Sequence, residues 1–186
     1  MTTSIAHPIT EVATRWQIDP AHSNIEFGVR HLMISTVKGR FGEVAGTVTV
    51  DPDDPKAVGV DVTLKTASID TRQDQRDAHL RSPDFFDASN FPVMTFRSTK
   101  VEQLRHGYLR VLGDLTIRGT TREVVLDVEE TGRGGDPWGN QRIGYNARTS
   151  IKRDDFGLIW NQALETGGVV VSSDVRITLD AELVKT

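Results

Sequence analysis

Apolar and polar residues alternate one for one along most of the chain after residue 15. Residues 169–183 show the pattern most clearly, with Val175, Ile177 and Leu179 separated by polar residues. Successive side chains of a β-strand point to opposite faces, so this period predicts strands with one face in water and one in a core. We expect strands near residues 16–18, 25–31, 44–50, 58–64, 94–97, 109–117, 124–128, 143–151 and 169–183.

The connections between these segments are mostly short turns, and strands do not alternate with helices. We expect a turn at Asp51–Pro55 and a loop at Gly132–Gly139, both rich in turn-forming residues. This spacing favours an antiparallel meander. With few helices to cover its apolar face, the sheet has to close into a barrel or fold into a sandwich, and long strands in an up-and-down order favour the barrel. The predicted fold is therefore all-β: an extended antiparallel barrel of roughly eight strands with one short helix.

One stretch interrupts the alternation. Residues 73–80 are polar helix formers that predict a short surface helix, with Asp70 or Thr71 as its N-cap. The stretch His79–Phe96 contains four of the seven Phe residues, and the stiff Pro83 and Pro92 lie on either side of three of them. We call His79–Phe96 the Phe-rich segment. It predicts an end cap on the β-structure.

Small residues stand at several positions of the apolar rows, where a barrel that fills itself would be expected to carry large ones. An unfilled gap in a folded core costs about 24 cal/mol per Å³. One interpretation is that a ligand fills these gaps, and the other is that strands bend or pack closely there. The sequence leaves both interpretations open for Gly46, Gly113, Ala147 and Ser173.

The sequence carries few signs of polar chemistry. It has no cysteine, its five histidines are scattered without metal-binding spacing, and it lacks nucleophile and phosphate-loop motifs. Its net charge is −4, and no basic patch supports nucleic-acid binding. We therefore expect no catalytic residue, no metal and no nucleic-acid partner.

The N-terminal residues resemble neither a signal peptide nor a membrane span. We expect residues 1–14 to form a flexible tail, residues 15–186 to form one domain, and the protein to be cytoplasmic without stable membrane insertion.

Several separated motifs stand in order along the chain: Trp16–Ser23, Arg76–Phe96, Gly113–Gly119, Asp136–Gly139 and Arg153–Leu158, followed by the strand Val169–Leu183. Together they resemble the YceI-like family. The resemblance covers nearly everything after residue 15 and implies an extended, lipocalin-like barrel with an elongated apolar pore. Members of that family bind polyisoprenoids or other long amphiphiles without metal or established catalysis, and many carry a secretory signal.

The expected function is non-enzymatic binding, storage or transport of a polyisoprenoid, an isoprenoid quinone or a fatty-acid derivative. Apart from this bound lipid, no cofactor is expected. His31 continues an apolar row, so its side chain either hydrogen-bonds at the barrel rim or contacts a ligand head group. The expected ligand-lining residues are Phe27, His31, Val48, Val62, Leu64, Phe85, Phe86, Met94, Phe96, Leu115 and Trp160.

Two alternatives remain at this point. A lipid isomerase or cyclase would use His31 or a buried carboxylate as acid or base. A ligand-free, stress-related interaction module would fill its own barrel. For the oligomeric state, a two-fold homodimer is the default expectation.

Overall fold

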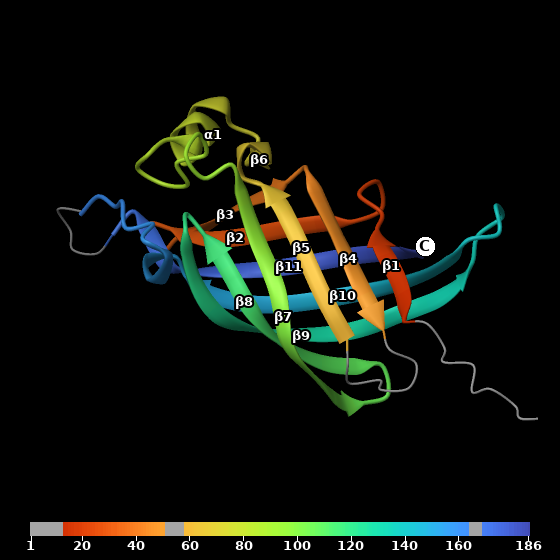
Figure 1. Ribbon diagram of the computed structural model, residues 1–186. Helices are drawn as coiled ribbons and strands as arrows, with labels where there is room; N and C mark the ends of the chain where they lie inside the picture. The colour runs from red at the N-terminus through yellow and green to blue at the C-terminus, as the bar shows by residue number, and fades with distance from the viewer. Residues whose placement is uncertain (1–12, 51–57, 164–168) are drawn as a thin grey trace, which may run out of the picture.

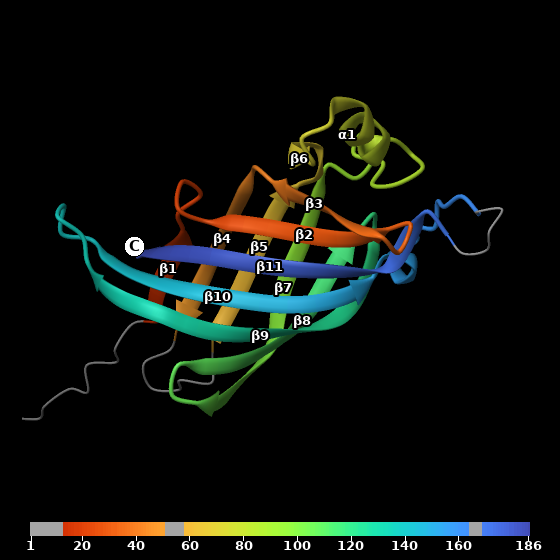
Figure 2. The same cartoon turned by 180° about the vertical axis from the view of Figure 1, so that it is seen from behind.

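The computed structural model describes residues 13–50, 58–163 and 169–186. Eight antiparallel strands form a closed barrel in the order β1-β4-β5-β7-β8-β9-β10-β11, and pairing of β1 with β11 closes it (Figures 1 and 2). The predicted fold class is confirmed. The barrel strands are β1 (Thr14–Ile18), β4 (Val44–Val50), β5 (Val58–Lys65), β7 (Val93–Arg105), β8 (Tyr108–Ile117), β9 (Thr120–Gly135), β10 (Gln141–Lys152) and β11 (Val171–Lys185).

A hairpin extends this barrel along the long strand β11. The end of β11 pairs with β1, whereas its earlier part, from Val171 to Asp180, pairs with β2. The strand β2 therefore continues the edge on which β1 lies, after a short turn. The hairpin consists of β2 (Asn24–His31) and β3 (Ser35–Phe41), and β3 in turn pairs with the two-residue strand β6 (Ile69–Asp70).

The strands differ from the sequence-based prediction at several places, and two of these differences have a clear physical reason. Strand β3 was not predicted, because glycine stands at Gly39 in its apolar row; the ring of Phe27 covers that position. The predicted loop Gly132–Gly139 is also wrong in its first half, because β9 continues to Gly135 and pairs there with β10. Backbone hydrogen bonds need no side chains, so a glycine-rich stretch can extend a ladder that side-chain periodicity does not reveal. The predicted turn at Asp51–Pro55 and residues 1–12 of the predicted tail lie outside the described residues. The predicted end of the tail at residue 14 is wrong, because Thr14 already belongs to β1 and pairs with Val50.

Cross-strand pairing shows which residues face the barrel interior. Buried Ile25 lies opposite Leu179, which lies opposite buried Ala147, which lies opposite Val128. Directly paired residues point to the same face of a sheet, so this row faces inward. Two core clusters of buried residues fill parts of the interior: Phe85, Met94, Ile117, Phe156 and Leu158 at one end, and Phe96, Val101 and Val111 on the β7–β8 side.

The glycines of the apolar rows leave no gaps. A Cβ atom at Gly113 would lie 2.6 Å from the Arg97 carbonyl oxygen and 2.7 Å from the Phe96 ring. At Gly46 it would lie 2.7 Å from the Ile18 side chain. Neighbouring side chains thus occupy these spaces, which favours close packing over ligand filling at both positions.

The helix α1 (Asp74–Arg81) is capped differently from the prediction. Its N-cap is Gln73, whose side chain accepts a hydrogen bond from the Arg76 backbone N–H. Asp70 instead accepts from the Arg72 N–H at 2.8 Å. Thr71 is also engaged elsewhere, because its N–H donates to the buried carboxylate of Asp77 at 2.9 Å.

The helix and the Phe-rich segment lie together over one end of the barrel, as Figure 1 shows. The Arg81 guanidinium fixes the helix by donating to the carbonyl oxygens of Ala67 at 2.8 Å and Ile69 at 2.6 Å. The first of these acceptors belongs to the short helix η1 (Thr66–Ser68), which precedes β6. Buried Phe85 joins the end cluster, so the predicted end cap is confirmed. Within the described residues, no helix has the length and apolar character needed to cross a bilayer.

The packing of Gly113 makes a prediction about stability. Gly113→Ala should lower the free energy of unfolding by about 1–3 kcal/mol, because the new methyl group would overlap a backbone carbonyl that cannot move aside. Urea denaturation measures this change. Gly132→Ala is the matched control, since nothing lies within 4 Å of a Cβ there. Equal stability of the two variants would show that Gly113 is not tightly packed.

Candidate functional site

A cavity of about 540 Å³ lies at the capped end of the barrel, between α1 and the strands β2, β3 and β11. This volume is typical of small-molecule pockets. One wall is the inner face of the β2–β3 hairpin, formed by Phe27, Val29 and Val37. Val29 and Val37 are direct cross-strand partners, so the alternation that builds the hairpin also builds an apolar wall.

The second wall is aromatic. The His79 ring meets Phe85 and Trp160 edge-on, with centroid separations of 5.0 and 4.8 Å, and Phe85 lies 5.3 Å from Trp160. The Asp84 carboxylate lies 2.9 Å from His79 Nε2 and holds the imidazole in this orientation. Leu80 of α1 completes the wall. A polar helix thus contributes an apolar and aromatic surface to the cavity.

A buried arginine positions the third wall. Arg153, in the short helix η2 (Arg153–Phe156), donates to the backbone carbonyl of Leu158, to Trp160 at 2.9 Å and to Ser172 at 3.0 Å. Burial lowers the pKa of this guanidinium below its usual range, although the nearby Asp154 carboxylate opposes that effect. Because Arg153 ties the segment of Trp160 to the start of β11, it fixes two neighbouring parts of the lining.

The opening of the cavity is polar and lacks acidic groups. No Asp or Glu contributes to the lining within the part of the chain described here. Arg76 is held at the opening by its Nε–H donation to the Thr71 hydroxyl at 2.7 Å. Arg30 donates to the Met33 carbonyl oxygen at 2.5 Å. We call the following residues the polar rim: Arg30, His31, Gln73, Gln75 and Arg76.

The apolar surface continues from the cavity into the barrel. Phe27 of the cavity wall pairs directly with Ile177, and the next inward residue of β11 is Leu179. Ile177 and Leu179 are only half-buried, as are Leu126 and Val128 on β9. Inward-facing side chains would be fully buried in a barrel that filled itself. The interior is therefore incompletely filled beneath the cavity.

The structure places the predicted ligand-lining residues in several groups. Phe27, His31, Phe85 and Trp160 come together around the cavity. Others pack in or against the end cluster (Leu64, Phe86, Met94, Leu115) or the β7–β8 cluster (Val62, Phe96), while Val48 lies half-buried on β4. Ligand contact by any of the eleven stays a prediction.

Most of the remaining lining was missed by sequence reasoning. Val29 could have been found, because it lies in the alternating row between Phe27 and His31. The helix residues could not, since Gln75, Arg76 and His79 are typical of a solvated surface helix. Only the folding of α1 over the hairpin makes them part of a cavity.

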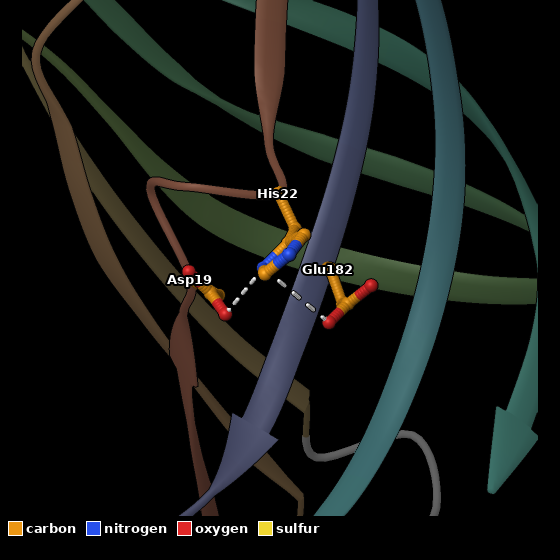
Figure 3. A group of neighbouring side chains, drawn as sticks. All are labelled: Asp19, His22 and Glu182. Atoms are coloured by element: carbon orange, nitrogen blue, oxygen red, sulfur yellow. Dashed lines mark hydrogen bonds and ion pairs between the residues drawn. The ribbon is translucent and has the colours of Figure 1, made fainter. Parts of the chain in front are cut away.

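A second cluster of chemically active side chains lies at the turn between β1 and β2. Figure 3 shows His22 between Asp19 and Glu182, with Nδ1 at 2.9 Å from an Asp19 oxygen and 4.0 Å from a Glu182 oxygen. The ligand atoms of these three residues lie within 4.8 Å of one another, the spacing of a metal site. Arg142, however, donates to Asp19 at 2.8 Å, to Glu182, and to Asp136 at 2.8 Å. A guanidinium thus already supplies the positive charge that these carboxylates require.

This network joins four parts of the barrel. The Arg142 guanidinium, and after it His22, lowers the pKa of Asp19 to about 2, and Arg142 likewise holds the pKa of Asp136 well below its usual range. The acidic partners make the pKa of Arg142 higher still. The cluster therefore acts as an electrostatic clamp between β10, β11 and the two turns.

The clamp predicts a pH dependence of stability. The folded pKa of Asp19 lies below its unfolded value, near 3.8, so its contribution is complete above pH 4 and is lost as the pH falls towards 2. Arg142→Met should lower the urea midpoint at pH 7 and flatten the decline between pH 4 and pH 2. Arg148→Met is the control, because Arg148 lies on the same strand without an ion pair among the described residues. Identical pH profiles for Arg142→Met and the unmodified protein would contradict the clamp.

Known proteins are similar to this chain in both sequence and fold. The model of the YceI-like domain matches residues 16–183. A UPF0312 protein of Vibrio cholerae is 42% identical over 156 residues, which cover 83% of this chain and 82% of that protein.

Solved structures of other proteins have the same fold as this chain. The Campylobacter jejuni YceI protein has a TM-score of 0.73 and 33% identity, covering 84% of this chain and 90% of its own. A polyisoprenoid-binding domain from Saccharophagus degradans, implicated in plant cell wall breakdown, shares the fold with a TM-score of 0.66 at 16% identity, covering 92% of this chain and 98% of its own. With the family model matching nearly all of the barrel, this chain belongs to the YceI-like family.

Proposed function

We propose that this protein binds one long apolar amphiphile, such as a polyisoprenoid, an isoprenoid quinone or a fatty-acid derivative, and stores or carries it without chemical change. The observation that carries the proposal is the continuity of the apolar cavity with the half-buried inner face of the barrel. Membership of the YceI-like family and the polyisoprenoid-binding structural neighbour support a lipid-binding role for the barrel.

The orientation of the ligand follows from the two ends of the cavity. The apolar tail extends past Phe27 and Ile177 into the barrel, where it replaces water against half-buried side chains. The polar head stays at the polar rim, where Arg30 and Arg76 supply N–H donors and no Asp or Glu of the described residues lines the cavity. A head group with carbonyl, hydroxyl or phosphate oxygens matches these donors.

The energetics agree with binding that depends little on polar contacts. Each buried CH₂ group contributes about 0.8 kcal/mol, so a chain of roughly twenty carbons gains about 16 kcal/mol before losses. Association and chain ordering cost about 4–15 kcal/mol. The balance permits useful affinity with few hydrogen bonds, which accounts for the scarcity of polar site motifs in the sequence.

Filling the barrel interior tests the proposal. Ile177→Trp should reduce bound lipid at least tenfold, because the indole would occupy the path of the tail below Phe27. Organic extraction and native mass spectrometry of purified protein measure the lipid, before and after addition of a long polyprenol, an isoprenoid quinone or a long-chain fatty acid. Thr178→Trp, on the adjacent outward and exposed position, should leave binding unchanged. The proposal fails if no apolar compound copurifies and none of the three probes binds.

The pair His79–Asp84 defines a second candidate, catalysis inside the cavity. An imidazole oriented by a carboxylate and facing an apolar chamber is an arrangement that acid–base catalysis can use. We favour an orienting role, because the same ring packs edge-on between Phe85 and Trp160. Each probe should accordingly return from the protein unchanged in mass and chromatographic retention. An isomer or cyclised product that disappears in His79→Gln would establish the enzyme instead.

A further inference from the structure

Large apolar side chains are exposed at the cavity end of the barrel. Met33 is 63% exposed, Ile34 80%, Ile159 72% and Val169 41%. These four, which we call the apolar tips, are half of the eight exposed large apolar residues in the described part of the chain. Their concentration at one end is unlike the single scattered residues of an ordinary soluble surface.

The apolar tips come from two neighbouring connections. Met33 and Ile34 lie in the β2–β3 turn, and Ile159 and Val169 lie in the connection between η2 and β11. The Leu32 N–H donates to the Val170 carbonyl oxygen at 2.9 Å, which joins the two connections. Figures 1 and 2 both show the β2–β3 turn beside the segment that precedes β11.

The outward position of Ile159 is fixed by the structure. Arg153 donates to the carbonyl oxygens of both neighbours of Ile159, Leu158 and Trp160. Leu158 is buried and Trp160 lines the cavity, so Ile159 is left to point into solvent. A rigid backbone thus presents this apolar side chain to whatever covers the cavity end.

The β2–β3 turn carries residues that folding does not favour there. Its central residues Leu32 and Met33 have φ values of 52° and 59°, and the Ile34 N–H bonds the His31 carbonyl oxygen at 3.0 Å. Two positive φ values in a hairpin turn favour Asn and Gly, and bulky side chains are strained there. Folding alone thus does not account for exposed Met33 and Ile34, which points to a role in contact.

Unpaired positive charges lie on the hairpin and strand that lead to the apolar tips. On the outer face, Lys38 and Arg176 flank the position of Gly28, and Arg30 lies two residues further towards the turn. None of these three cations forms an ion pair with a described residue. Acidic groups are also present in this region: Asp174 on β11, and Asp154 and Asp155 on η2.

We propose that the cavity end docks on the surface of a lipid bilayer that carries anionic head groups. The apolar tips insert among the head groups and upper acyl chains, while Arg30, Lys38 and Arg176 contact phosphate oxygens. The neighbours of the tips, including His31, Trp160 and Val170, line the cavity. Docking therefore places the cavity opening against the membrane, so an apolar chain passes between bilayer and barrel without crossing water.

The passage of a ligand between bilayer and barrel rests on the proposed function, whereas docking on the bilayer is a separate property. A bilayer fits this surface better than a protein partner does. The tips are separate protruding side chains, positive charges lie on the outer face of the same hairpin, and the bilayer is also the source of a long apolar ligand.

Vesicle sedimentation tests the proposal. The purified protein should bind phosphatidylcholine vesicles containing phosphatidylglycerol, and bind vesicles of phosphatidylcholine alone at least tenfold more weakly. The variant Met33→Gly/Ile34→Ser should bind the anionic vesicles at least tenfold more weakly than the unmodified protein. Its melting temperature should be equal or higher, because glycine adopts the positive φ of the turn without strain.

A second variant and a control complete the experiment. Lys38→Gln/Arg176→Gln should weaken binding to the anionic vesicles and reduce its dependence on salt. Trp138→Ser is the control, since Trp138 is 81% exposed in the β9–β10 turn, at the opposite end of the barrel in Figure 1. This variant should sediment with vesicles as the unmodified protein does.

The outcomes separate docking from ligand binding. Ile177→Trp, which fills the interior, should still sediment with anionic vesicles. Docking is overturned if Met33→Gly/Ile34→Ser binds vesicles as well as the unmodified protein does, whatever the ligand experiments show. It is also overturned if the unmodified protein does not bind vesicles but forms a dimer that this variant abolishes, because the apolar tips would then form a protein–protein interface. Vesicle binding without any extractable or added ligand would leave docking standing and remove the proposed function.

Discussion

The structure depends on the closure of the sheet along β11. One edge of this strand pairs with β10 from Asp174 to Val184, and the other edge is shared, first by β2 and then by β1. Closure removes the open edges that an antiparallel sheet would otherwise expose. Because β2 and β1 divide the edge, the β2–β3 hairpin extends past the ring of eight strands and forms a wall of its own. The cavity exists because this wall stands beside α1.

Much of the fold could be predicted from side-chain periodicity, because alternation reports directly on the two faces of a strand. The prediction failed where strand pairing depends on backbone hydrogen bonds alone. Gly39 interrupts the apolar row of β3, and the glycines at the end of β9 have no side chain to alternate, yet both stretches pair through backbone hydrogen bonds. The N-cap of α1 was missed for a related reason, since Asp77 competes for Thr71 through a buried contact that local sequence does not display.

The candidate site was predictable on its strand side and at two of its aromatic positions. Phe27 and His31 lie in an alternating row, and the apolar character of Phe85 and Trp160 drew attention to them. The opposite side required the three-dimensional structure, because α1 is polar and contributes its cavity residues by folding over the hairpin. Arg153 is a further case. It acts only by donating to backbone carbonyl oxygens, such as those of Trp160 and Ser172, and the sequence does not show that these come close to it.

At the cavity end of the barrel, rigidly held segments surround an interior that side chains fill only in part. Arg81 and Arg153 hold their segments through backbone carbonyls, and the end cluster packs Phe85 against buried side chains. Side chains held in this way cannot collapse into the adjoining space, whereas a loosely held wall would close over it. The arginine contacts and the Phe-rich segment are therefore part of what makes the cavity, and the segment also lines it through His79, Leu80 and Phe85.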